Sequence, residues 1–295
     1  MRDAPEDARA EPWTIARVLL WATADFRARG FEAPRLDAEL LLGHALAVDR
    51  IRLVLDATRP LSADELASYR ALIQRRRGSE PVAYILGERE FYGLTFRVDA
   101  RVLIPRPDTE TLVEVALTRT RGRELSGDAL DLCSGSGCVA IAFARARPTW
   151  RVTGVDVAAG AVQLSRQNAL RLGAVWGVGF ATGDLDARLP EASRFDLVTA
   201  NPPYVPSSEI ATLDAGIREF EPRIALDGGP DGTATLARVV ERAAARLRPN
   251  GVLAVEVGAG QAAAVHARLA AAGFRNIERA RDYGGIERVV SGVKD

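Results

Sequence analysis

Apolar side chains near the start of the chain recur at the spacing of α-helices. From Trp13 to Arg29 they fall three or four positions apart, and Gly30 follows as a natural helix end. The pattern returns over Arg35–Leu46. The segment Ser62-x-x-Glu65 then forms a capping box that opens a further helix. We therefore predict a small helical domain over residues 1–80.

The pattern changes after this domain. Short apolar runs at Tyr84–Leu86 and Leu94–Val98 are separated by glycines. Two such runs with a glycine-containing turn between them are typical of a β-hairpin. We expect residues 81–103 to form a hairpin connector.

From residue 112 onward the chain alternates between strand and helix patterns. Strands are predicted at 129–133, 151–157, 195–200 and 251–257, and helices at about 138–146, 160–172, 232–247 and 261–272. Such alternation is typical of a parallel sheet with helices on both faces. The last two predicted strands, near Arg275–Glu278 and Glu287–Ser291, are joined by a loop too short for a helix and should pair antiparallel. We therefore predict an α/β domain over residues 104–295, with a mostly parallel sheet and an antiparallel last strand.

Composition argues against several classes of function. The 295 residues include 39 Lys or Arg and 39 Asp or Glu, so no net charge attracts the chain to nucleic acid or to an anionic membrane. There is neither a signal peptide nor a run of 18 apolar residues, and we expect a cytoplasmic protein that does not span a membrane. The two histidines and two cysteines are too few and too scattered to suggest a metal site.

A glycine-rich turn follows the first strand of the predicted sheet. Ala129–Cys133 runs into Ser134-Gly135-Ser136-Gly137 and then directly into an apolar helix. In this context glycines let a ligand approach the backbone at a helix N-terminus. Asp156 ends the next strand, 21 residues after Gly135, where its carboxylate could accept both ribose hydroxyls of an adenosine ligand. The pattern indicates an adenosine cofactor rather than a purely structural turn, and leaves NAD and S-adenosylmethionine both open.

The tetrad Asn201-Pro202-Pro203-Tyr204 follows the predicted strand at 195–200. Ligands of open α/β sheets bind at this carboxyl edge. The two prolines lack amide hydrogens and restrict the backbone, so the Asn201 side-chain oxygen and a main-chain carbonyl can both face a planar NH2 group. Tyr204 can stack on that group. Hydride transfer needs none of this, whereas methylation of a poorly nucleophilic nitrogen needs the group held and aimed.

With this tetrad, the sequence resembles the class I S-adenosylmethionine-dependent methyltransferases, which have a Rossmann-like sheet and here would act on a planar amino group. More specifically, it resembles the peptide-chain release factor glutamine methyltransferases over nearly its whole length. The segments that carry this resemblance are Glu80-Pro81-Val82-Ala83-Tyr84-Ile85-Leu86-Gly87, Leu103-Ile104-Pro105-Arg106-Pro107-Asp108-Thr109-Glu110, Glu221-Pro222 with Ala225-Leu226, and Arg281-Asp282-Tyr283-Gly284-Gly285 with Glu287-Arg288-Val289. That family methylates the side-chain amide of the glutamine in the Gly-Gly-Gln motif of class I release factors.

The resemblance implies a role for each candidate residue. Residues from Cys133 through Gly137 would lie under the methionine part of S-adenosylmethionine, Asp156 would hold the ribose, and Asp184 and Leu185 would lie beside the adenine. Asn201, Pro202 and Tyr204 would be catalytic, with Asn201 also beside the cofactor and Pro203 helping to bind the substrate. Arg106 and Glu110 would have a supporting role near the methionine carboxylate or the pocket wall, or would form a structural ion pair. The expected partner is a class I release factor, with no nucleic acid or membrane required and with the enzyme as a monomer.

Three other interpretations remain open. Cys133-Ser134 replaces the Gly-Thr usual in the family's first turn, and a cysteine there resembles the sister group that methylates a glutamine of a large-subunit ribosomal protein. The tetrad could instead hold a flipped nucleic-acid base, although the zero net charge argues against this. A non-catalytic binding module is the third possibility. The helical domain, which contains none of these motifs, is assigned to substrate docking.

Overall fold

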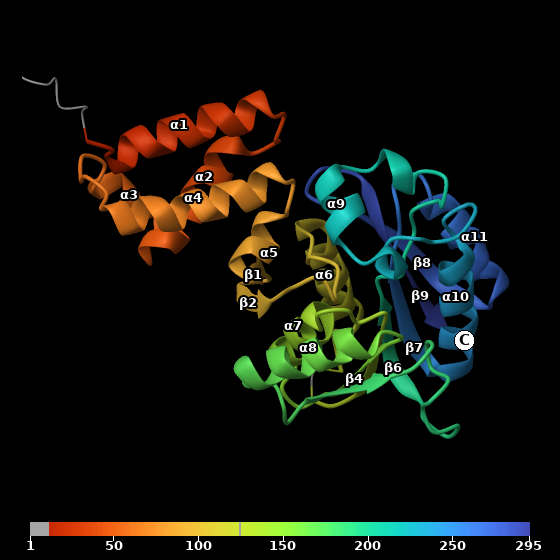
Figure 1. The fold of residues 1–295 in the computed structure, drawn as a ribbon. Coiled ribbons are helices and arrows are strands. Elements are labelled where there is room, and N and C mark those ends of the chain that lie inside the picture. Colours follow the sequence, from red (N-terminus) through yellow and green to blue (C-terminus); the bar gives the residue numbers. More distant parts are fainter. Residues whose placement is uncertain (1–11, 124) are drawn as a thin grey trace, which may run out of the picture. The chain divides into compact units, whose positions relative to one another are not determined.

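The computed structural model describes residues 12–123 and 125–295, and the chain divides into two compact units, one ending at Leu86 and one spanning Gly87–Asp295 (Figure 1). Each unit has its own hydrophobic core, built from buried side chains of that unit alone. Among the described residues, no helix combines the length and the apolar character needed to cross a membrane.

The first unit is a bundle of helices, as the apolar spacing predicts. Its helices are α1 (Ile15–Ala28), α2 (Pro34–Leu46), α3 (Arg50–Leu55), α4 (Ala63–Arg77) and α5 (Val82–Leu86). Both hydrogen bonds of the predicted capping box are present at the start of α4. The Tyr69 hydroxyl donates to the Ala38 carbonyl oxygen at 3.1 Å and ties α4 to α2. The strand predicted at Tyr84–Leu86 is wrong, because this short apolar run forms α5.

The arginine run at the end of α4 holds this bundle together. Arg76 and Arg77 form ion pairs with Asp37 of α2 and Asp25 of α1 at 2.9 and 2.7 Å. The Arg76 guanidinium also lies 3.7 Å from the centre of the Phe31 ring. These contacts join three helices by charge as well as by apolar packing.

The second unit begins with a β-hairpin and continues as a seven-stranded sheet. The hairpin strands are β1 (Glu88–Phe91) and β2 (Leu94–Arg97), which pair antiparallel. The sheet strands are β3 (Asp128–Leu132), β4 (Arg151–Asp156), β5 (Val178–Thr182), β6 (Phe195–Ala200), β7 (Leu247–Glu256), β8 (Phe274–Arg281) and β9 (Glu287–Lys294). Their order is β5-β4-β3-β6-β7-β9-β8, with β9 antiparallel to both of its neighbours and the other pairs parallel. The predicted α/β fold with antiparallel last strands is confirmed.

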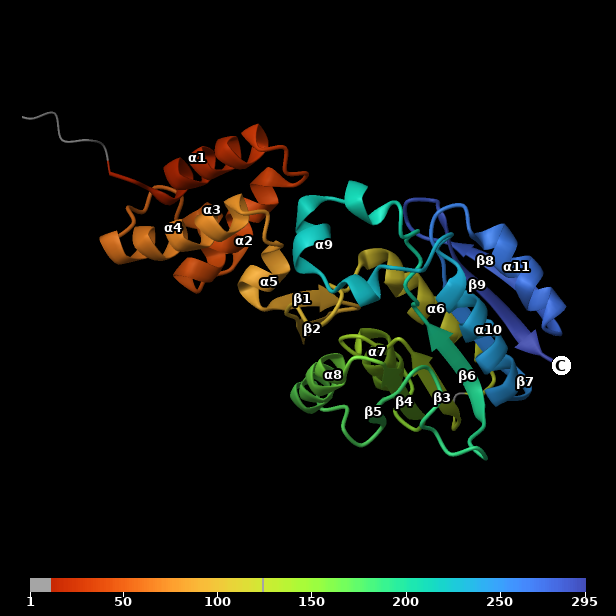
Figure 2. The same ribbon diagram turned by 45° about the vertical axis from the view of Figure 1, so that its right-hand side comes forward.

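Helices cover both faces of this sheet (Figure 2). They are α6 (Glu110–Arg119), α7 (Cys138–Ala146), α8 (Ala159–Arg171), α10 (Ala234–Arg246) and α11 (Ala262–Ala271), while the short helix α9 (Ala215–Phe220) contributes to neither core. Buried side chains of α6, α7 and α8 form one core with the sheet, and those of α10 and α11 form another. Burial on both faces explains why the part of β7 from Gly251 to Glu256 is buried without interruption, whereas most residues of the edge strand β8 are not buried.

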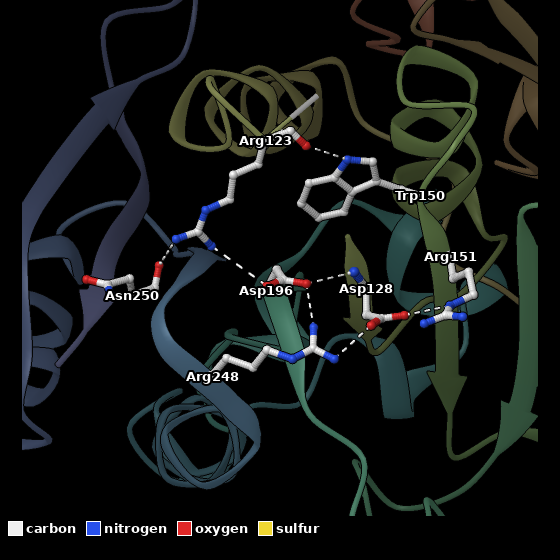
Figure 3. Close-up of polar contacts among 7 residues, drawn as sticks. All are labelled: Arg123, Asp128, Trp150, Arg151, Asp196, Arg248 and Asn250. Carbon is white, nitrogen blue, oxygen red and sulfur yellow. Dashed lines mark hydrogen bonds and ion pairs between the residues drawn. The ribbon is translucent and has the colours of Figure 1, made fainter. Parts of the chain in front are cut away.

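A network of charges closes the edge of the sheet where β3 and β6 begin (Figure 3). Arg248 bridges the two strands by binding Asp128 and Asp196 at 2.8 and 2.5 Å. The backbone N–H of Asp128 also donates to the Asp196 carboxylate at 2.9 Å. Arg151 and Arg123 add further contacts to the two carboxylates at 2.8 and 3.9 Å. This edge lies at the opposite end of the strands from the glycine-rich turn and the tetrad.

Candidate active site

The glycine-rich turn after β3 is held in place by the neighbouring strand β4. Cys133, Gly135 and Gly137 all have positive φ angles, of 58°, 52° and 80°. The Ser134 N–H donates to the Val155 carbonyl oxygen at 3.1 Å, and the Gly135 N–H donates to the Asp156 carboxylate at 2.8 Å. Positive φ angles explain why glycine is favoured at positions 135 and 137. They also bend the chain sharply between β3 and α7.

Asp156, at the end of β4, braces this turn with its carboxylate. One oxygen accepts the Gly135 N–H and the other accepts the Ala158 N–H at 2.9 Å. Burial raises the pKa of this carboxyl, while the two backbone N–H groups oppose that shift. Each carboxylate oxygen can accept a second hydrogen bond, so Asp156 can brace the turn and still bind a diol.

A cavity of about 620 Å³ opens beside the turn at the carboxyl ends of the parallel strands. Its lining residues are Cys133, Val155, Asp156, Val157, Gly183, Asp184, Leu185, Asn201, Pro203, Arg223, Ile224, Ala225, Asp227, Thr235 and Arg238. Five of the predicted cofactor residues are in this set. The others, Ser134, Gly135, Ser136 and Gly137, shape the turn without lining the cavity. The volume falls in the range of sites for drug-sized ligands.

The two residues predicted to contact the adenine, Asp184 and Leu185, both line this cavity. Leu185 has a φ of 51°, and its side chain is buried among apolar neighbours. Asp184 is half exposed and forms an ion pair with Arg238 of α10 at 2.7 Å. Arg238 and Thr235 could not be identified from the sequence, because nothing in the pattern of α10 distinguishes them from other polar helix residues.

The tetrad after β6 is rigidly held. The Asn201 Nδ2 donates to the Thr109 Oγ1 at 3.2 Å, which leaves Oδ1 as the acceptor of that side chain. The Tyr204 hydroxyl donates to Glu256 Oε1 at 3.4 Å. The backbone carbonyl oxygen of Tyr204 accepts from Gln261 Nε2 at 3.1 Å. Three side chains, one from the segment before α6 and two from residues 256–261, therefore fix both ends of the tetrad.

A second cavity, of about 200 Å³, also borders the tetrad. It is lined by Leu103, Arg106, Asn201, Tyr204, Val205, Leu213, Ile217, Ala225 and Leu226. Asn201 and Ala225 line both cavities, whereas Pro203 lines only the larger one and Pro202 is buried and lines neither. The apolar wall from Leu213 and Ile217 was not found from sequence, because these residues lie in a loop and a short helix without a motif.

The two predicted supporting residues lie in different places. Arg106 lines the smaller cavity and forms an ion pair with Glu221, whose buried carboxylate also accepts the Ile104 N–H at 3.1 Å. Glu110 lines neither cavity, and its carboxylate accepts the Tyr92 N–H at 2.9 Å in the turn of the β1–β2 hairpin. The structure therefore pairs Arg106 with Glu221 and not with Glu110.

Two carboxyl groups near the site have strongly raised pKa values. Burial raises the pKa of Asp131 to about 7 despite its hydrogen bond from the Thr199 hydroxyl at 2.7 Å. Burial likewise raises the pKa of Glu256 to about 7.

Within the described ranges, no three His, Cys, Asp or Glu side chains are grouped to hold a metal ion.

Comparisons with known proteins agree with this arrangement. A family model described as the PrmC N-terminal domain matches residues 17–87, and the methyltransferase small domain matches residues 108–218. The chain is 43% identical to the release factor glutamine methyltransferase of Geobacter sulfurreducens, over 96% of this chain and 98% of that protein. It is 40% identical to the enzyme of the same name from Vibrio cholerae, over 95% and 96% of the two chains.

Solved structures support the fold alone. A methyltransferase from Pyrococcus furiosus matches with a TM-score of 0.53 and 16% identity, over 78% of this chain and 98% of that chain. The catalytic domain of hMettl16, solved with an RNA hairpin, matches with a TM-score of 0.57 and 14% identity, over 72% and 80%. The sheet and its helices are thus shared with methyltransferases of quite different sequence.

Proposed function

This chain belongs to the release factor glutamine methyltransferases, and we propose that it transfers a methyl group from S-adenosylmethionine to the side-chain amide nitrogen of the glutamine in the Gly-Gly-Gln motif of class I peptide-chain release factors. The reaction would support translation termination in the cytoplasm. Full-length similarity to enzymes of that name favours the release factor over a ribosomal protein or a nucleic-acid base as the substrate.

The observation that carries this proposal is the position of Asn201 between two cavities. It lines both the larger cavity beside the glycine-rich turn and the smaller one beside Tyr204. A methyl transfer requires donor and acceptor atoms to meet in line at about 3 Å. Residues at the shared wall are the ones that can bring two ligands together in this way.

The larger cavity fits S-adenosylmethionine in size and in chemistry. Asp156 retains acceptor capacity for ribose hydroxyls after bracing the turn. Leu185 offers an apolar contact for the adenine, and Asp184, which also lines the cavity, would accept from the adenine amino group. Cys133, the residue of the turn that lines the cavity, would face the methionine part. The bound cofactor supplies an electrophilic methyl group on a sulfonium ion.

The smaller cavity fits the glutamine side chain. Asn201 Oδ1 would accept one hydrogen of the acceptor amide. The sequence assigns the other hydrogen to the Pro202 carbonyl oxygen, but Pro202 lines neither cavity in the structure. Tyr204 would pack on the face of the amide, and Leu213 and Ile217 would contact the methylene groups. Once methylated, the nitrogen is strongly acidic, so its proton can pass to the Asn201 oxygen, the Pro202 carbonyl oxygen or water without a strong base.

The proposal can be tested with purified protein and labelled S-adenosylmethionine. The substrates are an intact class I release factor, the same factor with the motif glutamine changed to alanine, a large-subunit ribosomal protein and duplex DNA. We expect label only in the unaltered release factor. Label in the altered factor would place the methyl group on another residue, and a preference for the ribosomal protein or DNA would replace the proposed substrate.

A further inference from the structure

Three arginines of α10 contact the loop that follows β5. Arg238, Arg242 and Arg246 are four positions apart, so they lie along one side of the helix. All three form ion pairs with this loop, which carries the two residues proposed to contact the adenine. Their role in adenine binding rests on the proposed function, because it requires S-adenosylmethionine in the larger cavity.

Asp186 anchors the loop to α10. Its side chain is 2% exposed, and its two carboxylate oxygens accept from Arg242 and Arg246, each at 2.5 Å. Arg246 is itself buried and also donates to the Pro190 and Glu191 carbonyl oxygens at 2.7 and 3.0 Å. Two cations on a buried carboxylate thus fix the loop immediately after the proposed adenine contacts.

The other end of the loop is tied to the proposed ribose site. The Gly183 N–H donates to the backbone carbonyl oxygen of Asp156 at 2.9 Å. Between the two ends, Leu185 has a φ of 51° and is buried among apolar side chains. A leucine keeps a positive φ only where its surroundings impose it. The backbone of this loop is therefore held in one conformation beside the larger cavity.

The Asp184 side chain is the part of the loop whose conformation this anchor does not set. It is about half exposed, and Arg238 Nη2 lies 2.7 Å from its Oδ2 atom. Both side chains line the larger cavity. A carboxylate on a fixed backbone can still adopt several rotamers, and the contact at Oδ2 selects among them. Oδ1 then remains as an acceptor for a ligand.

The two charges would respond to a purine base in opposite ways. The 6-amino group of adenine donates hydrogen bonds and would be attracted to Asp184, whereas the 6-oxygen of hypoxanthine accepts them and would be attracted to Arg238. The purine that is favoured depends on which charge faces it. We propose that Arg238 is a positioning residue: by holding Asp184 Oδ2 it directs Oδ1 at the adenine amino group, and so gives the site its preference for adenine.

This preference can be measured with S-adenosylhomocysteine and S-inosylhomocysteine, in which oxygen replaces the 6-amino group. Calorimetry on the full chain gives the ratio of the two affinities. We expect Arg238→Met to lower the preference for the adenine ligand by about threefold to fivefold, the range for an exposed ion pair. Arg238→Lys keeps the charge and should retain most of the preference. A preference that is unchanged in Arg238→Met would overturn the proposed role.

The matched control is Arg242→Met. It removes the same charge one turn further along α10, but Arg242 lines neither cavity and Asp186 keeps its contact with Arg246. The adenine preference of this control should equal that of the parent. An equal loss in the two methionine variants would overturn the role of Arg238, because general charge or loop stability would then explain it. A higher preference in Arg238→Met would also contradict it, since the guanidinium itself would then contact the base.

Asp184→Ala tests whether Arg238 acts through Asp184. Without the carboxylate, adding Arg238→Met should cause no further loss of preference, whereas a further loss of the same size would show that the arginine acts independently. If the parent binds neither ligand, the proposed function fails. If the parent binds both ligands equally, or if it prefers adenine and Arg238→Met keeps that preference, the role of Arg238 fails alone.

Discussion

Asn201 is the residue on which the two proposed ligand sites converge, since it lines both cavities. Replacing it with alanine should abolish most methyl transfer and leave cofactor binding nearly intact. Loss of one preorganised hydrogen-bonding group costs on the order of a hundredfold in rate. A radiolabel assay on intact release factor, paired with calorimetry on S-adenosylmethionine, measures both quantities. Activity within threefold of the parent would remove Asn201 from the proposed mechanism.

Asp156 should show the opposite behaviour. Asp156→Ala removes the acceptor for the ribose and also leaves the Gly135 and Ala158 N–H groups without their carboxylate. We expect S-adenosylmethionine to bind about 1.5–3 kcal/mol more weakly, as for other charge-assisted hydrogen bonds. Calorimetry reports the change directly. Unchanged affinity, or binding of NADH in its place, would contradict the cofactor assignment.

At the scale of single elements, the turn between β3 and α7 depends on Gly137. It has a φ of 80°, and a Cβ there would lie 2.8 Å from the Phe180 ring and 3.0 Å from the Ser165 Cβ. Gly137→Ala should therefore lower the free energy of unfolding by about 1–3 kcal/mol, through backbone strain and overpacking.

The matched control is Gly179→Ala in β5, where a Cβ meets nothing within 4 Å and φ is not positive. Denaturant unfolding of the parent and both variants provides the comparison. If the two variants are equally stable, the conformation of the turn does not require glycine at Gly137.

Elements with strong periodicity could be predicted from sequence, and weakly patterned ones could not. The long helices α1, α4 and α10 and the strands β3, β6 and β7 follow clear spacing. The five-residue run that forms α5 is too short for periodicity to separate helix from strand. Strand β5 contains Gly179 and was not among the predicted strands.

The candidate site shows the same division. The glycine-rich turn, Asp156 and the tetrad are contiguous motifs or lie at a fixed spacing, so sequence reasoning found them. Thr109 contacts Asn201, and Glu256 contacts Tyr204, only through folding, since the partners are separated by 92 and 52 positions. No local sequence pattern predicts such contacts. Arg238 is a similar case, because only the packing of α10 brings it to Asp184.

At the scale of the whole molecule, the first unit has a separate core, and its assignment to substrate docking stays a prediction. A glutamine in a Gly-Gly-Gln loop offers little surface, so selection must rest on contacts with the rest of the release factor. A protein lacking residues 1–86 should bind S-adenosylmethionine normally but methylate intact release factor with a much higher KM.

The truncated protein needs a melting curve beside the assay, since loss of the first unit could also destabilise the second. A short peptide containing the Gly-Gly-Gln motif is the matched substrate, because it lacks the surfaces that the first unit would recognise. We expect the full-length and truncated proteins to treat this peptide alike. A stable truncated protein with full activity on the intact factor would exclude the docking role.

The network of Arg248, Asp128 and Asp196 has a consequence for how such an enzyme could diversify. It fixes β3 against β6 at the end of the strands remote from the two cavities. The glycine-rich turn and the tetrad follow the other ends of the same two strands, so the distance between them depends on how the strands are paired. The loop and short helix that carry Leu213 and Ile217 take no part in it. During evolution, this wall could therefore change to admit a different acceptor while the geometry of methyl transfer is retained.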